Sequence, residues 1–420
     1  MERRNFSIFS NIKVIALSTI IVWTLIQLYL VLTYWNIEQV FDAQYYINEA
    51  IRHEQLGLPY PTIHNLYDKY IQSPGYINML AIIYCAYGNY HIMQLLNILF
   101  NVGIVINIFY LAKLFFDIRT AYISVIIYCI IPSNAFIPIW LVTELPYLFW
   151  GTTALNLSVK RNCICIILAG VLYAYSQMIR PITISFVLCS IMYYIINKSS
   201  VLQFLKLLIP YFIILTISGL YTYKQTGYFI TSSTVAGYDL MYTSYDDADG
   251  GQAPWFVFSE DGPGYIKHSD HISFAEKDAI WKKRSISWII GHPIQYIGLC
   301  VKRVEIMYKS DVWDNPYFME RYNDKSTRLL MFKVLFNIPY YLTLALFLYS
   351  IFVLLTGMIN NKGILLLYIF LGTGLTCLFG VEVRYHYPYV FVLAIYAAYT
   401  INLLFNCLQP HLIRRDNIKE

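Results

Sequence analysis

Charged residues are scarce in this chain. Asp, Glu, Lys and Arg make up 13% of its 420 residues, whereas hydrophobic residues make up 58%. An ordinary soluble domain carries about 25% charged residues, so this chain has too few of them to cover a globule of its size. The aromatic fraction of 17% is typical of a protein whose helix ends meet lipid headgroups many times. A small soluble domain is therefore excluded.

Several signatures of common function classes are also missing. The eight cysteines lie almost entirely in apolar runs without a CxxC pair, which favours packing residues over a disulfide framework or a zinc site. No Walker loop and no GxGxxG motif after a strand is present, so we expect no nucleotide or organic cofactor. The net charge of +5 is scattered and forms no basic face, and it therefore indicates no nucleic-acid partner.

What the sequence does contain is a series of long runs without a charged residue. A transmembrane helix needs about 20 apolar residues, and ten runs come near or exceed that length. They cover residues 14–36, 93–112, 120–143, 145–159, 162–179, 181–197, 207–223, 334–361, 363–381 and 387–410. The sequence therefore predicts an all-α polytopic membrane protein of about ten transmembrane helices.

The positions of Lys and Arg predict the orientation of these helices, because short cytoplasmic connections retain positive charge. The basic connections are the N-terminus with Arg3, Arg4 and Lys13, then 113–119, 160–161, 198–206, Lys362 and the tail with Arg414, Arg415 and Lys419. If all are cytosolic, both termini lie inside and the spans alternate without conflict. Residues 37–92, 224–333 and the turn from Glu382 to His386 then face outward.

This layout predicts three parts of the chain. Residues 1–223 form an N-terminal transmembrane module, 224–333 an extracytoplasmic loop domain, and 334–420 the C-terminal transmembrane helices with a short cytosolic tail. The apolar stretch 75–88 has only fourteen residues, fewer than a crossing needs. We interpret it as a helix at the outer surface, because an eleventh span would place the basic connections that follow on the outside.

The large outer loop has its own helix signals. Its 110 residues hold 27 of the 55 charged residues of the chain. Ser273 and Glu276 have the spacing of a capping box, which predicts a helix to about Ile290, and Pro293 can begin another helix. The second helix presents one aliphatic face, formed by Ile294, Ile297, Val301, Val304 and Tyr308. This face could lie on the outer membrane surface or pack on the core of the loop itself.

Charged residues at the edge of a membrane are costly and therefore mark candidate sites. The predicted outer boundary holds six titratable residues from four separated parts of the chain, namely Asp42, Glu144, Arg180, Glu382, Arg384 and His386. This set suits transfer of a group from a phosphorylated carrier to a hydroxyl. A carboxylate takes the proton of the acceptor, and fixed positive charge stabilises the leaving phosphate.

Within this set we assign Asp42 as the base, and Arg384, Arg180 and His386 to the donor phosphate, because a guanidinium meets phosphate oxygens as a bidentate fork. Each assignment has a structural alternative. Asp42 could cap a surface helix, Glu144 could pair with Arg180, and Glu382 could pair with Arg384. We predict no metal site, since His268, Asp270 and His271 lack flanking carboxylates at a helical spacing.

The order of these motifs resembles that of the GT-C glycosyltransferases, in particular the bacterial relatives of protein O-mannosyltransferases and lipid A aminoarabinose transferases. The matching elements, in chain order, are Phe41-Asp-Ala-Gln-Tyr45, Ser-Pro-Gly-Tyr76, Thr143-Glu144, Arg180-Pro181 and Glu382-Val-Arg-Tyr-His-Tyr-Pro388. The resemblance covers nearly the whole chain in layout. Each motif is short, and only their order makes them specific.

The resemblance implies a membrane glycosyltransferase with a sugar donor on a polyprenyl phosphate and an inverting displacement. Asp42 would be the acid-base residue and Arg384 would help to hold the carrier phosphate, with Glu144, Glu382, Tyr45 and Tyr76 in supporting positions. The acceptor would be a lipid, a glycan or a protein. The active site would face the periplasm or exterior from the cytoplasmic membrane. Many members have two adjacent acidic residues in the first outer loop, whereas Asp42 has none before Glu49, so the resemblance does not assign a divalent cation.

Two other functions fit the same features. A flippase or transporter of lipid-linked saccharides would place its charges near the middle of the bilayer and show two related halves, whereas here the charges gather at one edge. An oligosaccharide polymerase or ligase shares the long outer loop, and the sequence does not separate it from a glycosyltransferase.

Overall fold

The computed structural model describes residues 2–68, 70–160, 162–251, 254–267, 269–312, 327–355 and 361–416. The first part of the chain forms α1 (Glu2–Thr33), α2 (Asp42–Leu56), α3 (Ile63–Asp68), α4 (Pro74–Tyr87), α5 (Ile92–Phe115), α6 (Ile118–Ile130), α7 (Ser133–Phe136), η1 (Ile137–Ile139), α8 (Glu144–Ser158), α9 (Cys163–Ile179), η2 (Pro181–Thr183), α10 (Ile184–Ile196) and α11 (Val201–Thr226). The remainder forms α12 (Ala236–Met241), α13 (Pro254–Val257), η3 (Ser269–His271), α14 (Phe274–Gly291), α15 (Pro293–Tyr308), α17 (Thr327–Leu355), η4 (Asn361–Gly363), α18 (Ile364–Cys377), η5 (Val383–Tyr389) and α19 (Val390–Asp416).

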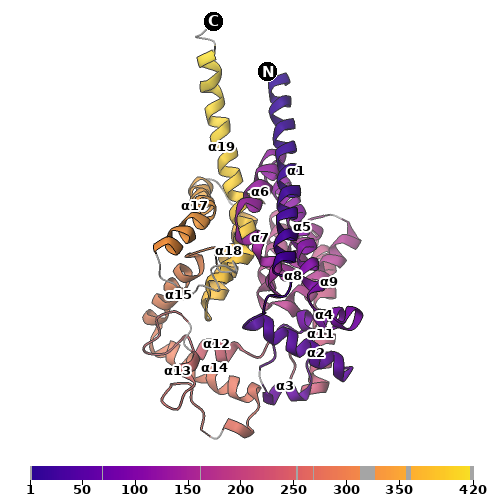
Figure 1. Cartoon of the computed structure of the whole chain (residues 1–420), viewed down its shortest axis with the longest axis vertical. Coiled ribbons are helices and arrows are strands. Elements are labelled where there is room, and N and C mark those ends of the chain that lie inside the picture. Colours follow the sequence, from indigo (N-terminus) through magenta and orange to yellow (C-terminus); the bar gives the residue numbers. More distant parts are fainter. Residues whose placement is uncertain are drawn as a thin grey trace.

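The helices form a bundle whose two ends differ (Figure 1). The N-terminal part of α1 and the C-terminal part of α19 project from one end of the bundle, which carries both termini. Helices α2, α3, α12 and α14 lie at the opposite end. Helices from segment 37–92 and helices from the large loop therefore meet at this end of the molecule. Several parts of the sequence predictions lie outside the described residues. They are Arg161, residues 252–253, His268 and residues 313–326 of the large loop, residues 356–360 of the predicted span 334–361, and Lys419 of the tail.

Several helices are long and apolar enough to cross a membrane. Five qualify within the described residues, and a sixth qualifies if α6 is counted together with the bent segment that follows it. They lie at Asn11–Thr33, Ile92–Phe115, Val201–Thr226, Leu329–Leu354 and Val383–Cys407. The chain is therefore a multi-pass membrane protein. Shorter apolar helices occupy Cys163–Ile179, Pro181–Ile196 and Asn361–Cys377, and the predicted ten crossings require these and α8 to cross as well.

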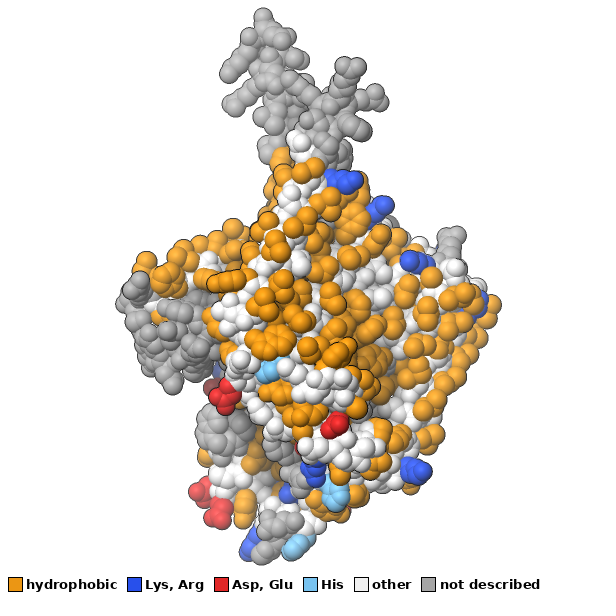
Figure 2. Space-filling model, turned by 45° about the vertical axis from the view of Figure 1, so that its right-hand side comes forward, with side chains coloured by type: hydrophobic (Ala, Val, Ile, Leu, Met, Phe, Trp, Pro, Cys, Tyr) orange, Lys and Arg blue, Asp and Glu red, His pale blue; other side chains and the backbone are white. Residues whose placement is uncertain are grey.

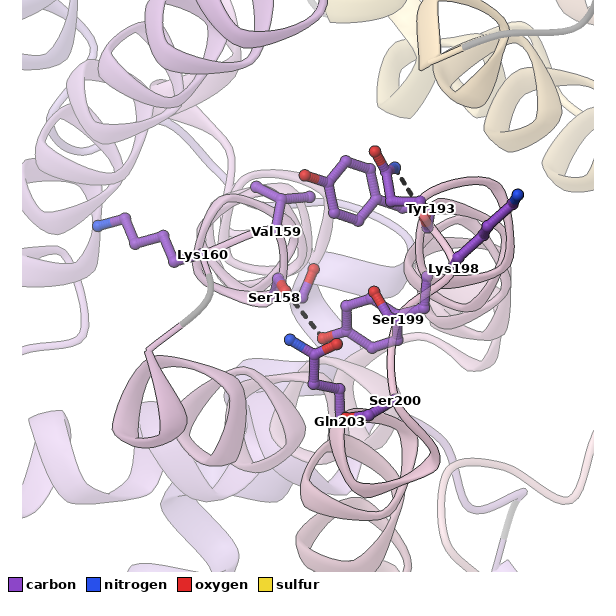
Figure 3. Close-up of a pocket in the computed structure, with 10 residues that line it drawn as sticks. Ser158, Val159, Lys160, Tyr193, Lys198, Ser199, Ser200 and Gln203 are labelled. Atoms are coloured by element: carbon purple, nitrogen blue, oxygen red, sulfur yellow. Dashed lines mark hydrogen bonds between the residues drawn. The ribbon is translucent and has the colours of Figure 1, made fainter.

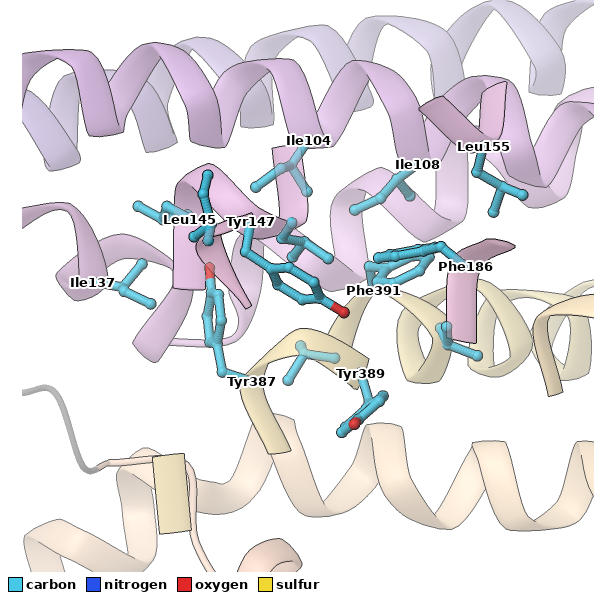
Figure 4. Packing of buried hydrophobic residues seen from close by; sticks show 14 of the residues in the cluster. Ile104, Ile108, Ile137, Leu145, Tyr147, Leu155, Phe186, Tyr387, Tyr389 and Phe391 are labelled. Carbon is cyan, nitrogen blue, oxygen red and sulfur yellow. The ribbon is translucent and has the colours of Figure 1, made fainter. Parts of the chain in front are cut away.

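The surface agrees with this assignment. On the face shown in Figure 2, hydrophobic side chains cover most of the middle of the molecule, and charged side chains lie mainly towards its borders. The interior is also apolar and unusually aromatic. Phe186 stacks on Tyr368 with ring centroids 4.1 Å apart, and Tyr147, Tyr389 and Phe391 belong to the same buried cluster (Figure 4). This core fixes the helices from which the candidate site is built.

The run 120–143 is not the single straight span that its hydropathy predicts. Helix α6 ends at Ile130, and the chain then bends by 72° into α7 and η1. Pro132 and Pro138 explain the break, because proline removes a backbone donor and disfavours a helical residue before it. The prediction of one continuous helix was therefore wrong in its second half.

The bent segment keeps its backbone hydrogen-bonded through side-chain amides from elsewhere in the bundle. We call these four residues the amide cluster: Gln39, Gln94, Asn97 and Asn101. Gln94 Nε2 donates to Ile139 O at 2.7 Å, Asn97 Nδ2 to Trp140 O at 3.0 Å, Asn101 Nδ2 to Asn134 O at 2.6 Å and Gln39 Nε2 to Ile139 O at 3.1 Å. Irregular backbone is tolerated at membrane depth only where protein groups satisfy it in this way.

The two hydrophilic segments are joined by a short antiparallel contact. Gln72 and Ser233 form an isolated β-bridge. Next to it, Ser73 N donates to Ser232 O at 2.9 Å and Thr234 N donates to Ile71 O at 2.8 Å. The start of α4 and the chain before α12 are thus held together, although about 160 positions separate them.

The helix signals of the large loop are confirmed. Ser273 and Glu276 form a capping box at the start of α14, and Pro293 occupies the first turn of α15. Helix α12 packs closely on α14 at Gly237, where an added Cβ would lie 1.9 Å from the carbonyl oxygen of Asp278. The backbone amide of Tyr238 donates to Asp278 Oδ1 at 2.8 Å, which fixes the first turn of α12.

Candidate functional site

Five of the six titratable residues predicted at the outer boundary form two neighbouring groups of ion pairs. We call the two groups together the charge cluster, and it consists of Asp42, Glu144, Arg180, Glu382 and Arg384. They come from the start of α2, the start of α8, the end of α9 and the segment around η5. The convergence expected from scattered charges at predicted helix ends is therefore observed.

Arg384 is the centre of the more solvent-exposed half of the charge cluster, which we call its outer half. Its Nη2 atom pairs with Asp42 Oδ2, and its Nε atom lies 2.8 Å from Glu382 Oε2. The Arg384 side chain is 15% exposed, whereas Asp42 and Glu382 are 31% and 41% exposed. One cation thus faces two carboxylates that solvent can reach. An incoming anion could replace either carboxylate without opening the core.

The inner half of the charge cluster is the pair of Glu144 and Arg180. Glu144 Oε1 lies 2.8 Å from Arg180 Nη1, and Glu144 is only 2% exposed. The two halves are linked by Tyr385, because the guanidinium carbons of Arg180 and Arg384 lie 5.4 and 5.6 Å from the centre of its ring. Such distances are typical of cation–π contacts. The aromatic ring therefore holds two like charges near each other.

Three members of the charge cluster lie at the end of a helix. Asp42 and Glu144 are the first residues of α2 and α8, where the helix dipole favours negative charge. Arg180 follows the last residue of α9, where the dipole favours positive charge. Phe41, immediately before Asp42, has a φ of 53°, a left-handed conformation that is rare for a bulky residue. Local backbone strain of this kind concentrates at functional sites.

Asp239 is a site residue that the sequence analysis missed. It lies on α12, and burial raises its pKa to about 8, with further contributions from Asp278, Asp42 and Glu382. Tyr242 donates a hydrogen bond to this carboxylate. The large loop thus adds a third carboxylate to the surroundings of Asp42 and Glu382. Nothing in its sequence context distinguishes Asp239 from the other acidic residues of the loop.

Tyr70, in the first outer loop, contacts the residue that precedes Asp239. The ring of Tyr70 lies 6.2 Å from that of Tyr238, and burial together with Asp42 raises the pKa of Tyr70. Tyr45, one of the predicted supporting residues, donates from its hydroxyl to Tyr70 O at 2.6 Å. Tyr45 therefore supports the backbone at Tyr70 and takes no part in the ion pairs described above.

The side chains of His386, assigned above to the donor phosphate, and of Tyr76, assigned a supporting position, are both buried. His386 is fully buried, and its Nε2 atom lies 2.8 Å from Asp311 Oδ1. Its ring thus faces the interior on the other side of η5, away from the solvent-accessible carboxylates. Tyr76 is also fully buried, and its ring meets Tyr46 edge-on at 5.3 Å. Tyr76 thus packs against α2, which carries Asp42, whereas the ring of His386 packs against Tyr308 and Tyr340.

A preformed metal site is not found in the part of the chain that the structure describes. No group of three or more His, Cys, Asp or Glu side chains among those residues is arranged to hold a metal ion. The carboxylates of Asp42 and Glu382 are instead both paired with Arg384. The two guanidinium groups could bind an anion only if it displaced a carboxylate from one of them.

A separate cavity of about 260 Å³ lies between the ends of α8, α10 and α11 (Figure 3). Ser158, Tyr194 and Gln203 are among its lining residues, and Lys160 and Lys198 point away from its centre. No member of the charge cluster lines it. It is therefore distinct from the candidate site.

Comparison with known proteins gives a likeness in structure but none in sequence. No family model matches the chain, and no curated protein sequence matches it. The structure is similar to that of the Archaeoglobus fulgidus oligosaccharyltransferase in the apo form, with a TM-score of 0.53 over 96% of this chain and 14% sequence identity. Archaeal oligosaccharyltransferase AglB from the same organism, in complex with an inhibitory peptide and a dolichol-phosphate, gives a TM-score of 0.47 over 97% of this chain at 15% identity.

These similarities concern only part of the known structures. The chain spans about half of their length, 52% of each. At this level of identity, similarity indicates the arrangement of helices and not the chemistry. The arrangement agrees with the fold that the order of the sequence motifs implied, and the chain has the GT-C fold of this oligosaccharyltransferase.

Proposed function

We propose that the chain is a membrane glycosyltransferase that moves a sugar from a polyprenyl-phosphate carrier to a hydroxyl acceptor. One observation carries the proposal. Asp42 and Arg384, 342 positions apart in the sequence, are in direct contact, so a base and a phosphate ligand are available at one point. The GT-C fold and the membrane helices support a lipid-linked donor.

The reaction that suits this geometry is a single displacement with inversion. The acceptor oxygen attacks the anomeric carbon, its proton passes to the Asp42 carboxylate, and the bond from that carbon to the phosphate oxygen breaks. The carrier phosphate leaves with the bonding electron pair, and Arg384 stabilises the charge that it gains. Arg180, held by Glu144, provides a second cation on the inner side.

The ion pairs of the free protein suggest how donor binding activates the base. Arg384 pairs with both Asp42 and Glu382, so a donor phosphate must compete for the same guanidinium. When the phosphate takes the place of Asp42, the carboxylate is released to accept a proton. Glu382 can retain its own contact through Nε, which keeps the Arg384 side chain in position.

The fold favours one further candidate within the same reaction type. The similar structure belongs to an oligosaccharyltransferase, and a protein with this fold could transfer an oligosaccharide as one unit instead of a single sugar. The two reactions differ in the mass of their products. We further propose that the site faces the exterior of the cytoplasmic membrane, as the distribution of Lys and Arg predicts.

The proposal can be tested by comparing surface glycolipids and glycans by mass spectrometry. Cells would carry the wild-type protein, Asp42→Asn, or Glu54→Gln, a matched loss of one carboxylate at the other end of α2. We expect the product with the wild type and Glu54→Gln and no product with Asp42→Asn, at equal protein amounts in the membrane. Formation of the product by Asp42→Asn would remove Asp42 from the mechanism.

A further inference from the structure

Helix α15 has an exposed aliphatic face. Ile294, Ile297, Val301 and Val304 recur at helical spacing, and 84%, 63%, 66% and 40% of their surfaces are exposed. We call these four residues the aliphatic stripe. A helix that packs on the core of a soluble loop buries such a face. For these four residues the alternative that the face packs on the core of its own loop is therefore contradicted, whereas Tyr308, the fifth residue of the predicted face, is half-buried.

The opposite face of α15 is buried and contains an arginine. Arg303 has no exposed surface. Its Nη1 atom donates to Cys377 O at 2.9 Å, and its Nη2 atom donates to Thr243 O. Arg303 thus lies on the inner side of the helix, whereas the aliphatic stripe lies on its outer side. In a bilayer this arrangement is favourable, because charged side chains face the protein and bond to carbonyl groups while lipid covers the apolar surface.

The contacts of α15 place it at the depth of apolar helices. Tyr308 Oη lies 2.7 Å from Thr373 Oγ1, inside α18. On the other side, Tyr340 and Tyr341 of α17 donate from their hydroxyls to Tyr308 O and Lys309 O at 3.1 and 2.9 Å. The candidate span of α17 begins at Leu329. The end of α15 therefore lies beside the interior of a predicted transmembrane helix.

Exposed apolar side chains also occur on α14 and α17, the helices that α15 contacts. Ile290, at the end of α14, is 75% exposed, and Met331 and Leu335 of α17 are 62% and 56% exposed. A separate, polar side of α15 carries the exposed residues Lys302, Glu305 and Lys309. Such a division into protein-facing, apolar and charged sides is typical of a helix in the interfacial region of a bilayer.

We propose that α15 is embedded in one leaflet of the membrane, with the aliphatic stripe in contact with lipid acyl chains. The inference does not depend on the proposed glycosyl transfer. It has a consequence for the candidate site, because the buried face of α15 contacts η5, which carries Arg384. Lipid contact would hold α15 against the bundle and thereby support the segment that presents the phosphate ligand.

Photo-crosslinking of the full chain in phosphatidylcholine vesicles tests this inference. Benzoylphenylalanine would replace Ile297 or Val301 in the aliphatic stripe, and Lys302, the neighbour of Val301 on the polar side, as the matched control. All three positions are exposed, so the bulky residue displaces no packed side chain. After irradiation, mass spectrometry would quantify lipid adducts on the peptide that contains α15.

The expected outcome is about fivefold or more lipid adduct at positions 297 and 301 than at position 302, since only the aliphatic stripe would reach the acyl chains. Equal yields at the three positions would overturn the inference. Adducts of positions 297 and 301 to a second copy of the chain, or to another segment of the same chain, would also overturn it, because they would identify a protein surface as the occupant of the stripe.

Discussion

His386 Nε2 lies 2.8 Å from Asp311 Oδ1, and neither side chain is exposed. The Nδ1 atom of the same ring contacts the carbonyl oxygen of Val383. The imidazole thus joins the end of the large loop to η5, two positions from Arg384. The backbone amide of Asp311 in turn donates to Asn337 Oδ1 of α17 at 2.7 Å. A buried chain of polar contacts therefore fixes the segment that presents Arg384.

We expect Asp311→Ala to destabilise the protein by about 1–3 kcal/mol, because it leaves a buried polar atom of His386 without its partner. It should also raise the KM for the lipid-linked donor, since η5 loses its support. Asp311→Asn, which keeps an oxygen acceptor, should lose less of both. Thermal unfolding in detergent and donor titration measure the two effects. An Asp311→Ala protein as stable as the wild type would contradict this role.

The pair of Glu144 and Arg180 should show strong energetic coupling. Glu144→Gln leaves a largely buried guanidinium unpaired and Arg180→Gln leaves a buried carboxylate unpaired, so each should cost about 3 kcal/mol. The double variant should cost less than the sum, with a coupling of about 2 kcal/mol. Unfolding of the three variants and the wild type gives this value directly. Glu382→Gln, with a 41% exposed side chain, is the control and should cost below about 1 kcal/mol. Additive losses would show that the two residues act independently.

The raised pKa of Asp239 predicts that the stability of the protein depends on pH. That pKa is raised from 3.8 to about 8 in the folded protein, so between these values the folded chain holds a proton that the unfolded chain has released. Stability should therefore fall as the pH rises from 4 to 8. Asp239→Asn should lack this contribution and gain stability relative to the wild type as the pH rises. Melting temperatures at pH 5 and pH 8 compare the two proteins, and parallel changes in both would argue against the assignment.

Two glycines of the large loop should respond in opposite directions to alanine. At Gly237 an added Cβ would lie 1.9 Å from Asp278 O, so Gly237→Ala must separate α12 from α14 and displace Asp239. We expect a loss of about 1–3 kcal/mol or more. At Gly298, within α15, an added Cβ would meet no atom within 4 Å, and Gly298→Ala should stabilise the helix by up to about 1 kcal/mol. Equal effects in thermal unfolding would refute the close packing of α12 on α14.

Much of the candidate site was predictable because charge is rare in this chain. Few ionisable residues lie outside the large loop, so Asp42, Glu144, Arg180 and Arg384 stand out at the ends of apolar runs. The ends of predicted spans on one side of a membrane lie at a similar depth, so these residues were expected to be close together. The starts of α14 and α15 were predictable because capping and proline signals act within a few residues. The roles of these residues in catalysis remain predictions.

Other features depend on tertiary contacts that local sequence does not encode. The break after Ile130 is stable only because amides from α5 and from the segment after α1 reach its backbone, and hydropathy cannot detect such partners. The elevated pKa of Asp239 results from desolvation and from neighbouring carboxylates that are distant in the sequence. His386 lies in the same motif as Arg384, and only the position of Asp311 turns its ring inward.

The amide cluster also bears on the order in which the chain is assembled. Gln39 and the three amides of α5 precede the bent segment 131–143 in the sequence, so they are synthesised first. When residues 131–143 emerge from the ribosome, hydrogen-bonding partners for their backbone already exist in the nascent bundle. Glu144, directly after this segment, would then reach its place before Arg180 is made, and the inner ion pair would close as α9 is completed.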